Sequence, residues 1–189
     1  MNDNLITDHH TPAKSFVNTA YKWALITSAY LIIKTYAIYL SDPTTYHPQK
    51  GGMALGLLDL LISLVAFYMA NKEFRDKENG GFLTYGKGFV VSYVTGLFIT
   101  AITTIFMFVF LSYQVDFDLM VSNMLDENAR QFKARGMGEQ DIAEALKRTK
   151  EFSTIGTMLT FSSIMFVFLY AIFALIVAAI TKRNPPTAN

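Results

Sequence analysis

The sequence contains no cysteine and a single tryptophan among its 189 residues. Without cysteine there is no disulfide, no thiol nucleophile and no thiolate metal site. Charge is scarce too: 16% of the residues are Asp, Glu, Lys or Arg, whereas soluble domains average about 25%. The 16 basic and 15 acidic residues leave a net charge of +1. We therefore expect no nucleic-acid partner, because nothing here builds a strong positive field.

Long apolar runs are what the sequence has instead. A helix rises about 1.5 Å per residue, so roughly 20 residues cross a hydrocarbon core of about 30 Å. The two later runs are uncharged, whereas the first contains Lys34 in its interior and the second contains Asp59. The pattern predicts an all-α membrane protein with four transmembrane helices in an antiparallel bundle. The predicted spans cover about 20–40, 52–71, 88–112 and 155–181.

A cleaved signal peptide is the alternative interpretation of the first run, which lies near the N-terminus. Residues 1–19 are largely polar, however, and Tyr39-Leu40-Ser41-Asp42-Pro43 is not a small-residue cleavage site. We therefore expect this helix to be retained. The chain then divides into a flexible cytoplasmic tail at 1–19, a single membrane domain at 20–183 and a C-terminal tail at 184–189.

Basic residues in short loops predict the orientation, because such loops stay in the cytoplasm. Loop 41–51 contains Lys50 alone, whereas loop 71–87 contains four basic residues. We expect loop 71–87 and both termini to lie in the cytoplasm. Loop 41–51 and the segment 117–152 would then lie on the opposite side. Segment 72–78 alternates charges at a spacing that allows i,i+4 pairs such as Lys72 with Asp76, and we expect it to extend the second helix.

Small residues predict which helix faces meet. Lipid is as apolar as leucine, so helices in a bilayer associate through close backbone contact and hydrogen bonds. Small residues recur at steps of three and four in the apolar runs, and Asp59 lies on the small-residue face of its helix. The residues expected to pack against other helices are Gly52, Gly56, Ser63, Gly96, Ala171, Ala174 and Ala178.

Lys34 and Asp59 lie at matching depth. Lys34 is six residues before the end of its run at Leu40 and Asp59 seven residues after Gly52, so both lie roughly 10 Å below the outer surface. A lone charge in hydrocarbon costs at least about 2.5 to 3.5 kcal/mol, and we predict an intramembrane ion pair. Two interpretations of the pair are a proton or cation site centred on Asp59 and a buried pair that fixes helix register. In a third interpretation Lys34 extends outward and Asp59 is protonated.

Segment 117–152 is polar and amphipathic. Apolar residues recur at three-and-four spacing over 117–135 and again over 139–152, and Gly136-Met137-Gly138 separates the two stretches. We predict a two-helix amphipathic hairpin inserted between the third and fourth spans. It packs on the bundle, lies in the membrane interface or binds a partner. The partner-binding residues would be Met120, Met124, Phe132, Met137, Ile142 and Leu146.

Signatures of catalysis and of cofactor binding are missing. The glycines between 80 and 88 follow no buried strand and precede no Gly-Lys-Ser/Thr, so they form no phosphate-binding loop. Asp8-His9-His10 lies in the N-terminal tail, and His47 lies across the membrane from it in the expected topology. We therefore predict no metal site, no cofactor and no enzymatic activity.

Three segments carry a resemblance that covers about residues 18–184. They are Arg75-Asp76-x-Glu78-Asn79-Gly80-Gly81-Phe82-Leu83-Thr84-Tyr85-Gly86-Lys87-Gly88-Phe89, the turn Arg135-Gly136-Met137-Gly138-Glu139-Gln140-Asp141-Ile142, and Ala178-Ala179-Ile180-Thr181-Lys182-Arg183. In these segments the chain resembles a family of small bacterial four-span membrane proteins designated a domain of unknown function. The family is typical of Gram-negative bacteria, so the resemblance implies the bacterial inner (cytoplasmic) membrane, with 117–152 in the periplasm. It transfers no catalytic residue.

Two functions from different classes are compatible with these features. The leading hypothesis is a non-enzymatic integral membrane scaffold or accessory subunit that acts through helix packing and the extracytoplasmic hairpin. Its partners would be other membrane subunits or a second copy of itself. The alternative is a small transporter or channel component that uses Asp59 as a proton or cation site. The two differ in whether Asp59 lines a water-accessible cavity or is sealed against Lys34.

Overall fold

The structure is a computed structural model that describes residues 16–47 and 50–184. Within these residues the chain forms six α-helices and no strand. Asp8-His9-His10 and most of the two predicted tails lie outside the described residues. The prediction of an all-helical chain is confirmed.

Four of the helices are long and apolar. Among the described residues, the four helices able to cross a membrane by length and composition are α1, α2 with its continuation η2, α3 and α6. The chain is therefore a multi-pass membrane protein. In chain order the elements are α1 (Phe16–Ser41), η1 (Pro43–Thr45), α2 (Gly52–Glu73), η2 (Phe74–Glu78), α3 (Tyr85–Tyr113), α4 (Phe117–Ala134), α5 (Glu139–Phe152) and α6 (Ile155–Thr181).

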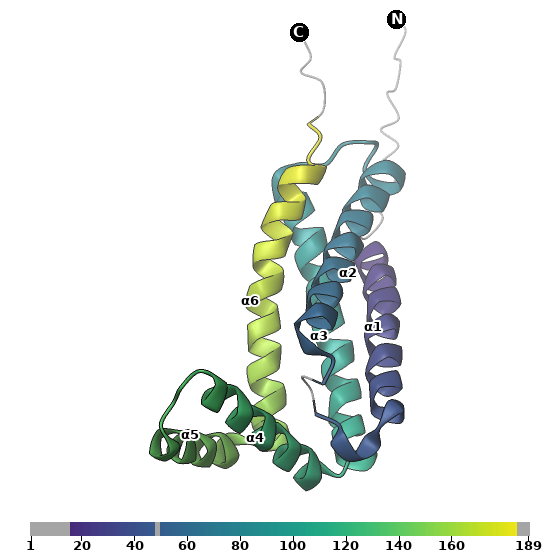
Figure 1. Ribbon diagram of the computed structural model, residues 1–189. Coiled ribbons are helices and arrows are strands. Elements are labelled where there is room, and N and C mark those ends of the chain that lie inside the picture. The colour runs from purple at the N-terminus through teal and green to yellow at the C-terminus, as the bar shows by residue number, and fades with distance from the viewer. Residues whose placement is uncertain (1–15, 48–49, 185–189) are drawn as a thin grey trace, which may run out of the picture.

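The long helices lie side by side, and α2 and α3 each contact all of the other long helices (Figure 1). The start of α1 and the end of α6 lie at the same end of the molecule, while α4 and α5 lie at the other end and pack against each other. The end of the molecule that carries the start of α1 and the end of α6 also contains η2 and the loop that follows it.

Side-chain caps explain where several helices begin. Thr84 Oγ1 accepts a hydrogen bond from the Lys87 amide at 3.4 Å, and Asp116 Oδ1 accepts one from the Leu119 amide at 3.1 Å. Thr154 caps α6 in the same way. Each side chain satisfies a backbone donor that has no partner inside the first turn. These local residues set the starts of α3, α4 and α6.

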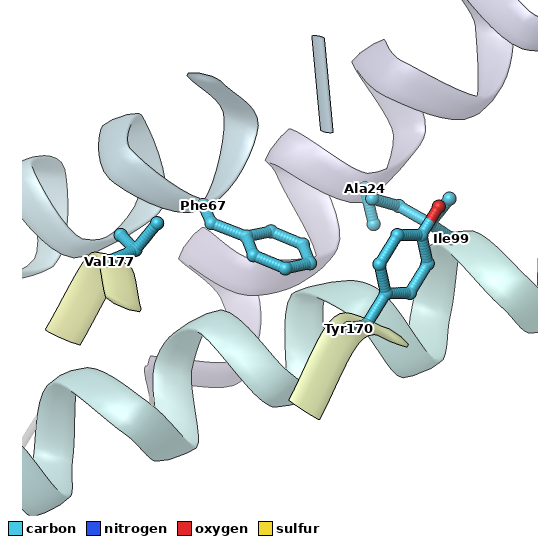
Figure 2. Packing of buried hydrophobic residues seen from close by; sticks show 5 residues of the cluster. All are labelled: Ala24, Phe67, Ile99, Tyr170 and Val177. Atoms are coloured by element: carbon cyan, nitrogen blue, oxygen red, sulfur yellow. The ribbon is translucent and has the colours of Figure 1, made fainter. Parts of the chain in front are cut away.

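The core between the long helices forms around Phe67 on α2 and Tyr170 on α6, whose rings lie 5.3 Å apart (Figure 2). Ala24, Ile99 and Val177 complete this cluster. Gly96 packs against both side chains, since a Cβ on it would lie 2.9 Å from atoms of Phe67 and of Tyr170. The absence of a side chain at Gly96 is what allows α2, α3 and α6 to meet here.

Gly52 and Gly56 differ from the sequence expectation. Both are exposed, and a Cβ at either position would meet nothing within 4 Å. The expectation that they pack against another helix of the chain is therefore wrong. Gly52 has a φ of +64°, a conformation that glycine adopts without steric cost. Its role is to turn the chain into α2.

Ser63 and Ala174 are buried, as is Ala178, whereas Ala171 is half-buried. Gly88 joins this end of the core, because a Cβ there would lie 3.4 Å from the Ala178 backbone. Small residues thus lie at helix contacts in the half of the molecule away from α4 and α5.

The continuation of α2 is a π-helix, η2, instead of further α-helix. Asp76 pairs with its neighbour Arg75, and Lys77 pairs with Glu73 at the i,i+4 spacing. Lys72 is exposed. The expected Lys72–Asp76 pair is therefore replaced.

At the opposite end, η1 and α4 cover α1 and α3. Tyr46 is 4% exposed and its ring lies 5.7 Å from the ring of Phe110. Burial raises the pKa of Tyr46 to about 12, because the charged phenolate loses its water. Met120 and Val121 of α4 belong to the same cluster. Part of the predicted partner-binding surface is therefore packed on the chain itself.

Candidate functional site

A cavity of about 320 Å³ lies between α1, α2, α3 and α6. It lies in the half of the molecule nearer α4 and α5, because Met107 and Leu111 near the end of α3 and Met158 near the start of α6 line it. Its wall combines apolar side chains with polar ones from all four helices. The polar lining residues are Lys34, Thr35, Asp59, Ser63, Thr100, Thr103, Thr104, Ser162, Ser163 and Tyr170.

Lys34 and Asp59 form an ion pair between Lys34 Nζ and Asp59 Oδ2 on the wall of this cavity. Their side chains remain 21% and 23% exposed. The other oxygen, Asp59 Oδ1, is buried and makes no hydrogen bond of ordinary geometry among the described residues, although Tyr30 of α1 lies close enough to interact with Asp59. The carboxylate is therefore satisfied by Lys34 at one oxygen, while the other oxygen is a buried acceptor without an ordinary hydrogen bond in the described part of the chain.

Hydroxyl groups from α3 and α6 meet across the cavity. Thr104 Oγ1 and Ser163 Oγ lie 2.8 Å apart and share a hydrogen bond. Thr100 and Thr103 occupy the neighbouring turns of α3 and bond to carbonyls of their own helix. A bilayer core offers no water to such groups, so this concentration of hydroxyls makes the cavity a polar site within an apolar protein.

The floor of the cavity is aromatic. Tyr170 lines the cavity and also packs against Phe67 in the core cluster of Figure 2. Its hydroxyl lies 3.4 Å from Ser63 Oγ, one turn along α2 from Asp59. The cavity therefore ends at packed side chains toward the end of the molecule formed by η2.

A second polar cluster joins the helices at that end. Glu73 accepts hydrogen bonds from Lys22 Nζ and Trp23 Nε1, each at 2.8 Å, and from Lys77 Nζ at 3.1 Å. Glu78 accepts one from Thr19. These contacts join the start of α1 to the end of α2 and η2.

Comparison with known proteins places the chain in a family. Residues 22–183 match the family described as "Protein of unknown function (DUF4199)". The chain belongs to this family. No curated protein and no solved structure matches the chain. The membership agrees with the resemblance found in the sequence, and the DUF4199 match extends over all the long helices except the first turns of α1.

Two of the three segments that carried the resemblance, 75–89 and 178–183, meet in this DUF4199 chain. Leu83 and Arg183 exchange two backbone hydrogen bonds of 2.8 Å each. Asn71 Nδ2 donates to Thr181 Oγ1 at 2.9 Å, and Arg75 donates to the Thr181 carbonyl at 3.4 Å. The loop after η2 and the end of α6 are thus held together, which gives these family residues a structural role.

The residues predicted for partner binding are spread over different surroundings. Met120 and Met124 are buried, and Phe132, Ile142 and Leu146 are half-buried between α4 and α5. Met137 is 37% exposed. Phe152, which the sequence interpretation did not select, is 68% exposed.

The sequence interpretation also did not identify the cavity. It assigned none of the hydroxyl residues Thr100, Thr103, Thr104, Ser163 and Tyr170 to a polar cavity. The signal that could have found the cavity is the Thr103-Thr104 pair within an uncharged span, because two adjacent hydroxyls in hydrocarbon need partners. Among the described residues, no group of three His, Cys, Asp or Glu side chains is placed to hold a metal ion.

Proposed function

We propose that this DUF4199 protein is a non-enzymatic transporter component in which Asp59 is the proton or cation site of an intramembrane cavity. The observation that supports the proposal is the position of the Lys34–Asp59 pair. It lies on the wall of a cavity of about 320 Å³ and keeps about a fifth of each side chain exposed.

A pair that only fixes helix register does not need such a cavity. Protein interiors pack at a density of about 0.74, and a buried pair is strongest when its remaining hydrogen-bonding atoms are satisfied. Here Asp59 Oδ1 makes no hydrogen bond of ordinary geometry among the described residues. The arrangement therefore does not maximise stability, and the cavity beside the partly exposed pair is what favours the binding of a mobile group.

The topology that we propose is a four-span antiparallel bundle in a bacterial inner membrane, with both termini cytoplasmic. The four basic residues of loop 71–87, against Lys50 alone in loop 41–51, support this orientation. The hairpin of α4 and α5 then lies in the periplasm, and the cavity lies nearer the periplasmic side.

Reconstitution into liposomes tests the proposal. We expect flux of protons or monovalent cations with the wild-type protein and loss of that flux with Asp59→Asn, which keeps the size of the side chain and removes its charge. Asp126→Asn, on the exposed surface of α4, serves as the matched control and is expected to keep the flux. Wild-type flux in Asp59→Asn, or no flux in any of the three proteins, would sink the transport proposal.

A scaffold or accessory-subunit role is the second candidate, and α5 favours it. This helix packs against α4, has no buried residue, and lies beside the long helices instead of among them (Figure 1). Partners would be other membrane subunits or a second copy. Crosslinking in native membranes, followed by purification in mild detergent, should then capture a partner that is lost on deletion of 117–152. Recovery of monomer alone from both proteins contradicts this role.

A further inference from the structure

Three hydroxyl oxygens of the cavity wall are arranged to accept hydrogen bonds. A hydroxyl group has one proton to donate. Thr100, Thr103 and Ser63 each donate that proton to the backbone carbonyl four residues earlier, at 3.0, 2.8 and 2.9 Å. Their oxygens therefore keep lone pairs that can accept hydrogen bonds, and that of Ser63 lies 3.4 Å from the Tyr170 hydroxyl. A ligand that donates several hydrogen bonds fits this wall better than one that accepts them.

The negative charge of Asp59 also favours a ligand that donates hydrogen bonds and is positively charged. Asp59 Oδ2 accepts from Lys34 Nζ, while Asp59 Oδ1 is buried without a hydrogen bond of ordinary geometry among the described residues. In the described lining of the cavity, Asp59 supplies the negative charge and Lys34 the positive charge. The position in contact with Asp59 is thus a cation site, and a lysine ammonium already occupies it.

We propose that Lys34 is a tethered competitor for this site, and that the ligand is a small primary ammonium ion which displaces Lys34 from Asp59. The proposal rests on the function proposed above, because it names the ligand of the same cavity. Lys34 Nζ has three donors and no acceptor, the same head group as a free primary ammonium ion. The contact that it makes with Asp59 therefore demonstrates that the site accommodates the head group.

Space is sufficient for the exchange. A cavity of about 320 Å³ has room for about ten waters at roughly 30 Å³ each, and hence for a small ammonium ion with part of its hydration. Choline-sized quaternary ions have no N–H group to give to Asp59 and the hydroxyl oxygens. The chemistry of the wall thus separates primary from quaternary ammonium.

The Lys34 side chain also has an alternative position after displacement from Asp59. It lies seven residues before the end of α1 at Ser41, which is about 10 Å along the helix axis. A lysine stem of four carbons can extend toward the membrane surface and place its charge there. Displacement therefore exchanges one paired ammonium for another at Asp59, and the carboxylate is never left without a cation.

Competition predicts how substitutions at Lys34 act. The apparent dissociation constant is the intrinsic value divided by the fraction of protein whose site is free. If Lys34 occupies Asp59 about nine-tenths of the time, Lys34→Gln tightens ligand binding about tenfold. Lys34→Arg has the opposite effect, because a guanidinium holds a carboxylate with two parallel hydrogen bonds and keeps its charge. We expect it to weaken binding about tenfold or more.

The experiment is calorimetric titration of the full chain in lipid nanodiscs with methylammonium chloride, with choline chloride keeping the ionic strength constant. Wild type, Lys34→Gln, Lys34→Arg and Asp59→Asn are compared. The double variant Lys34→Met/Asp59→Asn removes both charges together, so it folds without an unpaired charge and is expected to bind nothing. Thermal unfolding of each sample establishes that it is folded.

Tighter binding in Lys34→Gln, weaker binding in Lys34→Arg and none in the two Asp59 variants supports the proposal. Equal binding in all five proteins overturns it, as does the absence of binding in folded Lys34→Gln. A parallel titration with sodium chloride tests the ligand class, and binding of sodium in place of methylammonium overturns the ammonium assignment.

The two proposals fail separately. If the liposome flux depends on Asp59 but methylammonium does not compete with Lys34, the tethered-competitor proposal is wrong and the transport proposal stands. If methylammonium binds as expected but Asp59→Asn leaves the flux unchanged, the cavity is a binding site without a transport role.

Discussion

Gly96 and Gly56 are both glycines inside long apolar helices, yet their surroundings differ. A Cβ on Gly96 would lie 2.9 Å from Phe67 and from Tyr170, whereas one on Gly56 would meet open space. Sequence spacing places both on small-residue faces, so it does not distinguish them. Only the rotation and offset of neighbouring helices decide which glycine is needed for close contact.

Gly96→Ala is therefore expected to destabilise the protein by about 1 to 3 kcal/mol, as overpacking of a dense core does. Gly56→Ala is the matched control and should be neutral or stabilising by up to about 1 kcal/mol, because alanine favours the helix. Equilibrium unfolding in mixed micelles measures both. Equal changes in the two variants would show that the Gly96 contact is not tight.

Asp42 illustrates a charge whose surroundings are local. Hydrogen bonds from the Thr45 and Thr44 hydroxyls and from Lys50 hold the pKa of its carboxyl well below the usual range. Because the folded pKa is depressed, the carboxylate contributes to stability at pH values above its ordinary pKa of about 3.9. That contribution is lost as the pH falls through the folded pKa.

We thus expect the η1 turn to persist from pH 7 down to about pH 4 and to loosen below that. The backbone amide signals of Thr44 and Thr45, followed by NMR in micelles, report the transition. Asp42→Asn still caps the turn but does not titrate, so its signals should not change over the same range. An identical transition in both proteins would assign it to another group.

At the scale of elements, the end of α2 shows local sequence and tertiary contact acting together. The alternating charges of 72–78 predicted a helical extension, and the chain does continue, as the π-helix η2. The partners of the charges were not predictable in this way, because Glu73 bonds to Lys22 and Trp23 of α1. Those residues are about fifty positions away in the sequence and reach Glu73 only after packing.

Glu73→Ala should lower the free energy of unfolding by about 1 to 3 kcal/mol. The substitution removes a carboxylate that is 15% exposed and that accepts several charge-assisted hydrogen bonds. Trp23 is the single tryptophan, so its fluorescence reports this contact directly. We expect a red shift in the variant, since the indole loses the acceptor that holds it.

Glu144→Ala is the control for this prediction. Glu144 pairs with Arg148 one turn away on exposed α5, and such surface pairs contribute about 0 to 1 kcal/mol. Its removal should change neither the unfolding free energy appreciably nor the emission of Trp23. If Glu144→Ala lowered the unfolding free energy as much as Glu73→Ala, the contacts of Glu73 between α1 and α2 would contribute no more to stability than an exposed surface pair.

At the scale of the whole molecule, the cysteine-free sequence makes the proposed topology directly testable. Lys72→Cys and Ser122→Cys each place one thiol at an exposed position, at opposite ends of the molecule. In spheroplasts, an impermeant maleimide should label Ser122→Cys at once and Lys72→Cys only after the membrane is permeabilised. Labelling of both without permeabilisation would contradict four crossings in the proposed orientation.

The four long apolar helices and the two polar helices between the third and the last are properties of the sequence by itself. They depend on the length and periodicity of local runs, which are visible in the order of the residues. The depth of Lys34 and Asp59 likewise follows from counting residues along two helices joined by a short loop.

The cavity, its aromatic floor and the contacts of Glu73 were decided by the tertiary structure alone. Each depends on how far neighbouring helices slide and rotate, and a shift of one residue turns a side chain by about 100° around its helix. Thr104 and Ser163 share a hydrogen bond although nothing near either residue specifies the other. The physical reason is that hydrophobicity selects which segments enter the membrane, whereas side-chain packing selects which faces meet and where space remains between them.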